Sequence, residues 1–377
     1  MSKYPVPFID LPKEYKELDT KMLSKRFKNI LLSGRFILGK EVEKFEEAMA
    51  DYLEVEAVVA VNSGTDALIL SLKALGVGPG DEVITVAHTF AATIAAIKHV
   101  GATPVLVDTR KYSYNMDTNL VEEAITDKTK VILPVHLNGR CCCMDSIWVI
   151  AYSHALYIIE DACQALGSMF KGQKAGSWGL GCFSTHPLKT LSAAGDGGYI
   201  AIPSEYRDRI EYLRDLRNHG TWDKVHFDTI GYNSRLDEVQ ASILNWKLPN
   251  LPSFIDRRRK VAMRYQKGLE NVKQVKLPYP PELLEPGCWY DTYNGYTVRV
   301  PERERLVKHL YQRGIETLVN WPIPLHLQKC FGLEHYKGKL PVTEMLSKEV
   351  LNLPIFPQME NKQVDTVIGA IKDFYNG

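Results

Sequence analysis

An aspartate and a lysine, each close behind a short apolar run, are the residues of this sequence best suited to chemistry. The run from Leu156 to Ile159 is closely followed by Asp161, and a second run ends at Ser184, five residues before Lys189. Ligands of open α/β sheets sit beyond the carboxyl ends of the strands, so we expect these side chains to share a pocket. A desolvated lysine amine can attack a carbonyl carbon, and an aspartate can keep a pyridine nitrogen protonated. Together they form the minimal apparatus for pyridoxal phosphate chemistry.

Each of these residues also has a purely structural interpretation. A single lysine is usually a solvated surface amine, and Asp161 at a strand end can cap the next helix. The spacing D-x-x-Q followed by S-x-x-x-x-K is by itself a weak pattern. A cofactor site requires in addition a cradle for a phosphate group and a side chain that stacks on a planar ring.

Two earlier strand-to-helix junctions offer these groups. Gly64 permits close backbone approach to a ligand, Thr65 adds a hydroxyl, and the helix that begins there supplies unpaired N–H groups for an anion. Phe90 follows another expected strand, where its ring can stack on a ligand. The alternatives are an ordinary N-cap at 63–65 and a core phenylalanine at a helix start. The sequence has neither H-x-x-x-H nor C-x-x-C spacing, so we expect no metal site.

Composition places the chain among ordinary globular proteins. The 377 residues are 45% hydrophobic and 24% charged, with a net charge of +1, so no strong attraction to nucleic acid or membranes is expected. No apolar run approaches the roughly 20 residues that span a bilayer, and the first residues lack a signal-peptide pattern. The seven cysteines are an odd number in such a chain. These features predict a cytoplasmic protein with reduced thiols.

The order of expected elements indicates an α/β protein. From residue 57 to residue 160, apolar runs of strand length alternate with segments of helical periodicity. This alternation is typical of βαβ units and predicts a mostly parallel sheet with helices on both faces. We expect N-terminal helices and a large domain over 1–250, and a smaller domain over 251–377. The smaller domain is expected to have strands near 290–300 and 315–319, and helices near 254–270, 301–312, 343–350 and 361–375.

Seven ordered segments resemble the DegT/StrS family of sugar-nucleotide aminotransferases, which are fold-type I pyridoxal phosphate enzymes. The likeness spans nearly the whole chain. It implies an aspartate-aminotransferase-like fold, with a mostly parallel central sheet flanked by helices and a smaller C-terminal α+β domain. The seven segments are V-N-S-G-T-D-A-L, G-P-G-D-E-V-I-T, E-D-A-C-Q-A-L-G, F-S-T-H-P-L-K, G-D-G-G, G-Y-N-S-R-L-D-E-V-Q-A and P-L-H-L-Q.

The resemblance implies a role for each site residue. Lys189 matches the lysine that holds the cofactor covalently and later moves protons. Asp161 matches the partner of the pyridine nitrogen, and Gln164 lies near the ring hydroxyl. His326 lies in the segment that meets the sugar substrate. The other implied cofactor-binding positions are Gly64, Thr65 and Ser184 at the phosphate, Phe90 on the ring, and Asn233, which reaches the phosphate from the other subunit.

The implied function is transfer of an amino group from an amino acid, with glutamate expected, to a nucleotide-linked keto-sugar. The segment N-W-P-I-P-L-H-L-Q resembles that of family members that aminate C3 rather than C4. This resemblance favours a 3-keto-6-deoxyhexose as the substrate. The resemblance also implies a homodimer with shared active sites. In the residues themselves, Asn233 has the alternative of capping the helix that follows it.

Two other classes of function stay open. One is a different pyridoxal phosphate reaction on the same scaffold, such as amination of a cyclitol ketone or dehydration of a sugar. The other is a regulatory homologue without catalysis. Lys189 argues against the dehydratase branch, whose members have histidine there. The intact pair of Lys189 and Asp161 argues against a regulator.

The sequence departs from the family pattern at two places. Thr185 stands where an aromatic residue is frequent, and Cys141–Cys143 replace a common Pro-Ala-Asp run. Because the triplet lies outside the motifs and lacks metal spacing, we expect it to be a structural loop feature.

Overall fold

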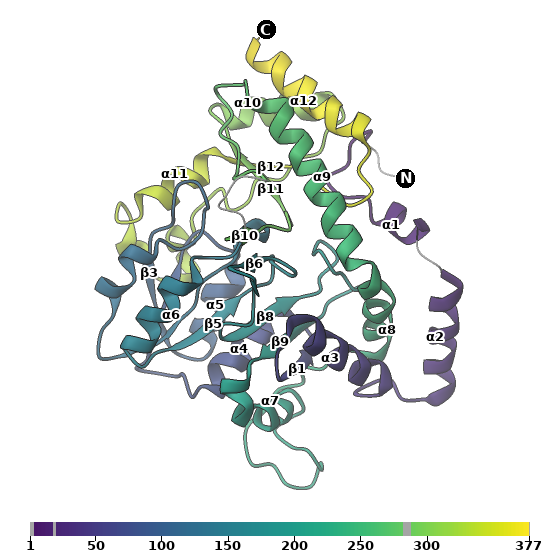
Figure 1. Cartoon of the computed structure of the whole chain (residues 1–377). Coiled ribbons are helices and arrows are strands. Elements are labelled where there is room, and N and C mark those ends of the chain that lie inside the picture. Colours follow the sequence, from purple (N-terminus) through teal and green to yellow (C-terminus); the bar gives the residue numbers. More distant parts are fainter. Residues whose placement is uncertain (1–3, 18–19, 282–287, 377) are drawn as a thin grey trace.

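The computed structural model describes residues 4–17, 20–281 and 288–376, and a seven-stranded sheet forms its centre (Figure 1). Neighbouring strands are parallel except β9, which runs antiparallel to both of its neighbours. The expected mostly parallel sheet is therefore confirmed. In spatial order the strands are β1 (Ala57–Val61), β9 (Gly198–Ile202), β8 (Leu180–Ser184), β5 (Tyr157–Asp161), β4 (Thr129–Ile132), β2 (Glu82–Val86) and β3 (Thr103–Val107).

Helices cover both faces of this sheet. The strands are apolar at consecutive positions, as in the A-V-V-A-V of β1, because strands covered on both faces bury every side chain. In Figure 1, α3 (Lys40–Leu53) and α6 (Met144–Ser153) lie in front of the sheet, whereas α4 (Gly64–Ala74) and α5 (Ala91–His99) lie behind it.

The strand directions bring the two chemical segments to one edge. β5 and β8 are parallel neighbours in which Asp161 is opposite Cys182, so both strands end at the same edge of the sheet. β8 is also paired with antiparallel β9. The connection over 185–197, which contains Lys189, therefore begins and ends at that edge.

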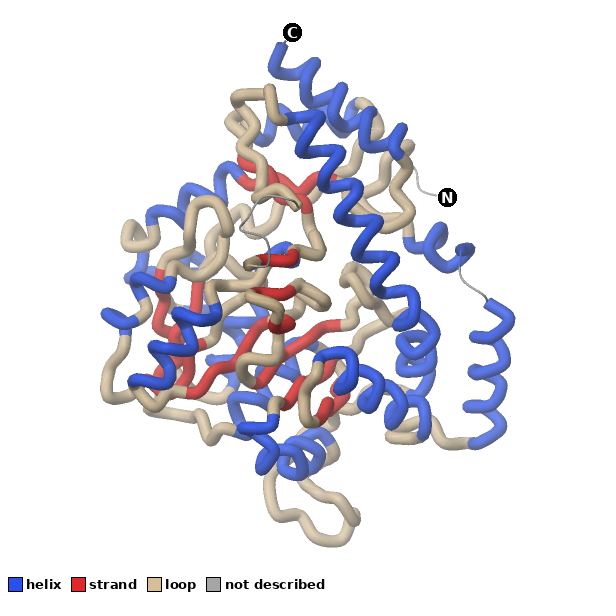
Figure 2. Tube along the Cα trace, in the orientation of Figure 1, coloured by secondary structure: helices blue, strands red, loops and turns tan. Residues whose placement is uncertain are grey.

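A second group of elements packs around a two-stranded sheet, drawn apart from the main sheet in Figure 2. Its hydrophobic core includes Tyr296, Leu353 and Val364. Helix α9 runs from Leu251 to Leu269, and its first half packs on the main core while its second half packs here. We propose that a division near residue 250, with α9 crossing it, separates the two domains. The other elements of this part are β11 (Tyr296–Arg299), β12 (Val350–Leu353), α10 (Arg303–Gln312), α11 (Pro341–Glu349) and α12 (Asn361–Asn376).

One expected strand of this region is absent. Residues 315–319 form only single bridges, Val6 with Ile315 and Leu318 with Asn352. The strand that pairs with β11 along its full length is β12, which the sequence analysis did not predict. The V-L-N-L run is apolar enough for either a helix end or a strand, and only its pairing with β11 selects the strand.

Shorter elements complete the chain. Among the described residues no helix is both long enough and apolar enough to cross a membrane. The remaining helices are α1 (Leu11–Glu17), α2 (Thr20–Ser33), α7 (Ile210–Arg217) and α8 (Glu238–Lys247), and a small three-stranded sheet is formed by β10 (Trp289–Tyr290), β6 (Met169–Phe170) and β7 (Gln173–Lys174).

Candidate active site

A cavity of about 440 Å³ lies at the sheet edge where β5 and β8 end. Its inner wall comes from the sheet, and its outer wall comes from the N-terminal segment and from loops of the C-terminal region. Seven of the nine residues proposed from the sequence for cofactor or substrate line this inner wall. These seven are Gly64, Thr65, Phe90, Asp161, Gln164, Ser184 and Lys189.

The loop that carries Lys189 is closed by backbone hydrogen bonds. Thr185 N–H donates to the Gly197 carbonyl at 2.9 Å, and Ala193 N–H donates to the Thr185 carbonyl at 2.7 Å. Lys189 N–H donates to the His186 carbonyl at 2.9 Å, which forms a tight turn ahead of the amine. The half-buried Lys189 side chain therefore enters the cavity from a constrained loop.

Asp161 is oriented from two sides. Its Oδ2 accepts a hydrogen bond of 2.7 Å from the Thr93 hydroxyl, and Thr93 Oγ1 lies 2.8 Å from Thr89 Oγ1. Its Oδ1 accepts from the Cys163 N–H at 3.3 Å. No helix begins at Asp161, so the alternative of a helix cap is wrong. The sequence analysis did not identify Thr89 or Thr93, although both belong to the H-T-F-A-A-T segment beside Phe90.

Glu160, the neighbour of Asp161, points away from the cavity. It is fully buried and accepts backbone N–H bonds from Gly176, Trp178 and Gly179 at 2.7 to 3.0 Å. His136 Nε2 lies 2.8 Å from its Oε2, and His136 Nδ1 accepts from a backbone N–H, so Nε2 donates to the carboxylate. Successive strand residues face opposite sides. One acid therefore serves the cavity and the other holds the loop before β8.

The junction at 63–65 forms a narrow concave surface. Ser63 caps α4, because its Oγ accepts from the Asp66 N–H at 3.1 Å, while the first N–H groups of the helix have no partner inside it. A Cβ at Gly64 would lie 2.7 Å from Cys163 Sγ and 2.9 Å from the Ser184 Cβ. Only glycine allows this approach. The cap and the anion site are thus two properties of one junction.

Gln164 and Phe90 complete the inner part of the cavity. Gln164 Oε1 accepts the Asn138 N–H at 3.0 Å, which fixes the amide. Phe90 is 60% exposed at the start of α5, so the alternative of a core phenylalanine is wrong. Its ring lines the cavity instead.

The comparison with known proteins agrees with this geometry. Residues 18–372 match the DegT/DnrJ/EryC1/StrS aminotransferase family. The chain belongs to this family.

The curated relatives that it resembles cover it almost completely. It is 41% identical to a pleiotropic regulatory protein of Geobacillus stearothermophilus, with 98% of both chains covered. It is 41% identical to dTDP-3-amino-3,4,6-trideoxy-alpha-D-glucose transaminase of Streptomyces venezuelae, covering 98% of this chain and 96% of the relative. It is 40% identical to UDP-N-acetyl-3-dehydro-alpha-D-glucosamine 3-aminotransferase of Acidithiobacillus ferrooxidans, covering 99% and 98%.

A solved structure also matches the fold of this chain over nearly its whole length. The crystal structure of S. venezuelae DesV in complex with a ketimine intermediate superposes with a TM-score of 0.94, at 40% identity over 99% of both chains. This member of the DegT/DnrJ/EryC1/StrS family is thus a pyridoxal phosphate-dependent aminotransferase with the expected fold. The cavity fits the cofactor, since the Gly64 cradle, the Asp161 carboxylate and the Lys189 amine meet in one space.

Two residues proposed for this family member lie outside the cavity of the chain. Asn233 is exposed, and its backbone bridges to Asn218. It does not cap α8, whose N-cap is Asp237. His326 is fully buried, and its Nε2 lies 3.2 Å from Glu344 Oε1. Its predicted contact with substrate stays a prediction, and in this chain its imidazole faces Glu344.

The outer wall contains residues that the sequence analysis missed. Trp321 lines the cavity, has a left-handed backbone with a φ of 48°, and meets the buried His88 ring edge-on at 5.2 Å between centroids. Non-glycine residues with positive φ often mark functional sites. The sequence signal for Trp321 was its place in N-W-P-I-P-L-H-L-Q, the segment from which only His326 was expected at the site. Further outer-wall residues are Phe8, Asn294, Leu318 and Asn320.

Proposed function

We propose that the protein transfers an amino group from an amino acid, with glutamate expected, to a keto-sugar linked to a nucleotide. The observation that carries this proposal is the meeting of Lys189, Asp161 and the start of α4 in one cavity with a largely uncharged outer wall. The names of the dTDP- and UDP-sugar relatives support the substrate class.

In this proposal each inner-wall residue acts at a stated atom. The Lys189 amine would hold the cofactor covalently and, when free, would take a proton from the donor α-carbon and return it. The Asp161 carboxylate accepts the pyridine N–H bond. Thr65, Ser184 and the N–H groups at Gly64 bind the phosphate. When bound, pyridoxal phosphate stabilises the electron pair left on the donor α-carbon.

The outer wall suits a sugar ring. Phe8 and Trp321 offer aromatic faces to C–H groups, and Asn320 offers an amide to hydroxyls. The names of both transaminase relatives refer to position 3 of the sugar, one to a 3-amino sugar and the other to 3-amination of a 3-dehydro sugar. We therefore propose C3 as the position aminated and a 3-keto-6-deoxyhexose as the favoured acceptor.

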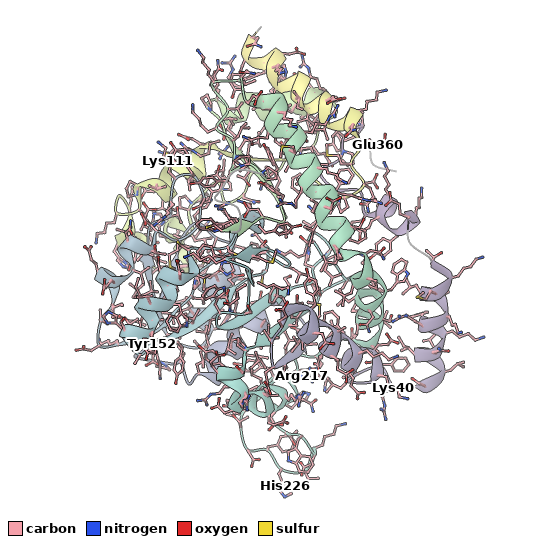
Figure 3. All side chains as sticks on the ribbon, viewed as in Figure 1. Lys40, Lys111, Tyr152, Arg217, His226 and Glu360 are labelled. Atoms are coloured by element: carbon pink, nitrogen blue, oxygen red, sulfur yellow. The ribbon has the colours of Figure 1, made fainter. Side chains whose placement is uncertain are left out.

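We also propose that the active unit is a homodimer. Among the described residues that line the cavity, Lys189 alone is a lysine or arginine, although the cofactor phosphate and the donor carboxylates are anionic. Asn233 stands next to an exposed loop that projects from the body of the chain, where Figure 3 labels His226. Four apolar side chains are exposed on this loop, namely Trp222, Val225, Phe227 and Ile230. A two-fold partner would cover them and receive Asn233 at its phosphate site.

The cellular site proposed is the cytoplasm. Six cysteines, namely Cys141, Cys142, Cys143, Cys163, Cys182 and Cys330, are free thiols. Free thiols in this number are typical of a reducing compartment.

Two measurements test the proposed reaction. Borohydride reduction of the purified holoenzyme is expected to attach the cofactor to the peptide that contains Lys189. Glutamate with dTDP- and UDP-linked 3-keto-sugars is expected to yield 2-oxoglutarate and the amino-sugar. Lys189→Ala is expected to lower turnover about 1,000-fold or more, whereas Lys260→Ala, on an exposed side chain of α9, keeps it.

The same panel separates the alternatives. A keto-cyclitol that outcompetes the keto-sugars would contradict the substrate proposal. Full turnover by Lys189→Ala would contradict the role of Lys189. A protein that binds the cofactor but aminates no ketone would match the regulatory role named for one relative.

A mixing experiment tests the homodimer. Lys189→Ala and Asn233→Ala are each expected to be impaired alone. A mixed dimer places both defects in one site and leaves the other site with Lys189 of one chain and Asn233 of the partner subunit intact, so partial activity returns. No recovery after subunit exchange, or an active monomer, would contradict the shared site.

A further inference from the structure

Helix α8 holds the loop that carries Lys189 at two points. Gln240 Oε1 accepts the Ala194 N–H at 2.9 Å, and Lys247 Nζ donates to the Ser192 hydroxyl at 2.9 Å. Gln240 and Lys247 are seven residues apart, which is two helical turns, so they lie on one face of α8. The loop segment that follows Lys189 is therefore fastened to a single helix face.

Lys247 is an unusual anchor because its side chain is fully buried. Its ammonium lies 2.7 Å from Glu14 Oε1 and 4.4 Å from the centre of the Tyr15 ring. Glu14, on the N-terminal helix α1, keeps only 10% of its side chain exposed. A buried ammonium is tolerated only when it is paired and hydrogen-bonded. The position of Nζ, and with it the contact to Ser192, thus depends on Glu14.

A second buried cation, Arg258, supports the segment beside the lysine loop. Arg258 on α9 is 2% exposed, and its Nη1 donates to the carbonyls of Ile355 at 3.0 Å and Tyr293 at 3.3 Å. Burial lowers the pKa of Arg258 to about 10, and the charge of Glu14 opposes that shift. Beside Tyr293, Asn294 lines the cavity, and its Oδ1 lies 3.4 Å from the Thr190 hydroxyl. The segment that Arg258 holds therefore contacts the lysine loop at Thr190, on the other side of Lys189 from Ser192.

We infer that Lys247 and Glu14 are positioning residues for Lys189, and that helix α1 acts through them to set the geometry of the catalytic loop. The contact chain runs from Glu14 to Lys247, then to Ser192, three residues after Lys189. The inference rests on the role proposed above for Lys189. A purely structural role, in which the buried pair only fastens α1 to α8, is the competing explanation.

Three variants separate these explanations. Ser192→Ala removes the loop end of the chain of contacts and leaves the buried ion pair intact. The double variant Lys247→Met with Glu14→Gln removes both charges, so no unpaired charge stays buried. Glu17→Gln is the matched control. It lies one turn later on α1 and breaks the 2.6 Å pair with Arg257, an exposed link to α9 that does not involve the loop.

The expected results concern the loop and the chemical step. In the holoenzyme, Ser192→Ala and the double variant lower the rate of the glutamate half-reaction about 10-fold, with KM for the keto-sugar within about 2-fold, because misplaced reacting groups slow chemistry more than binding. Hydrogen exchange of residues 185–198 in the cofactor-free protein rises several-fold, and the absorbance of the bound cofactor shifts. Glu17→Gln changes none of these.

Two outcomes would overturn the inference, and they differ from failure of the function itself. If the variants lose thermal stability but keep the half-reaction rate, loop exchange and absorbance of the wild type, the pair is only structural. If Glu17→Gln has the same effect as Ser192→Ala, the effect is not transmitted through Lys247. If borohydride fails to label Lys189 in the wild type, the proposed function fails first, and the positioning role fails with it.

Discussion

The inner and outer walls of the cavity are built in different ways. The inner wall is made of residues that directly follow strands, such as Gly64 after β1 and the Lys189 loop after β8, so the order of the sheet brings them together. The outer wall joins Phe8 to Leu318 and Trp321, which no regular strand or helix contains. The inner wall thus follows from topology, which many relatives share, whereas the outer wall depends on packing between distant segments.

After the loss expected for Lys189→Ala, the next largest effect contrasts two neighbouring acids of β5. Asp161→Asn is expected to lower kcat about 100-fold, because an amide supplies no negative charge at the pyridine nitrogen. Glu160→Gln is expected to keep the chemistry but to lower the free energy of unfolding by about 2–3 kcal/mol, because Glu160 accepts three backbone bonds in the core. Turnover and thermal unfolding of both variants measure this. If Glu160→Gln lost more turnover than Asp161→Asn, the conclusion that Asp161 faces the cavity and Glu160 faces the core would be wrong.

A smaller and more selective effect is expected at the outer wall. Trp321→Ala is expected to raise KM for the keto-sugar about 5-fold, since burial of a ring face against a ligand is worth ~1 kcal/mol. The glutamate half-reaction is expected to stay within about 2-fold of the wild-type rate. Trp148→Ala, on the exposed face of α6, is the control. An equal loss in both half-reactions would show that the two walls are not functionally separate.

The stability that the buried His88 ring contributes beside Trp321 is expected to depend on pH. Burial lowers the pKa of His88 to about 4, and the rings of Trp321 and Tyr114 face it. In the unfolded chain a histidine titrates near pH 6.5, so between these values the unfolded state binds a proton that the folded state rejects. The contribution of His88 to stability is therefore complete above about pH 6.5 and decreases by about 3 kcal/mol as pH falls toward 4.

Denaturant unfolding of the wild type and of His88→Leu between pH 7 and pH 4.5 measures this contribution. The stability difference between the two proteins is expected to shift in favour of the variant as pH falls. A difference that stays constant over this range would contradict a neutral, buried His88.

The smallest effect is expected at the cysteine triplet. Cys141 and Cys142 are buried in the main core and Cys143 is half-buried at the start of α6, away from both walls. Replacing all three with alanine is expected to leave turnover within a few-fold and to lower the free energy of unfolding by about 1–3 kcal/mol through small cavities. Bound zinc, or loss of turnover, would contradict this structural role.

Local pattern predicted the centre of the inner wall, and the family resemblance added Ser184 to the phosphate site at Gly64. An apolar run closely followed by a polar or charged residue marks a strand end, and parallel strands end at one edge, so Asp161 and Lys189 could be placed together before any contact was known. The same reasoning failed for residues 315–319 and for β12. An apolar run shows that a segment is buried, but the choice of its partner depends on segments far away in the chain.

The sequence by itself determined the sheet, the family, and the residues that meet at the end of β5 and β8. Only the tertiary structure decided that Glu160 and Asp161 serve opposite faces in different roles, that Trp321 borders the cavity while His326 is buried beside Glu344, and that Lys247 anchors the catalytic loop. The reason is physical. Strand and helix periodicities arise from neighbouring residues. The ion pair of a buried lysine, in contrast, forms only when a helix far away in the sequence places a carboxylate beside it.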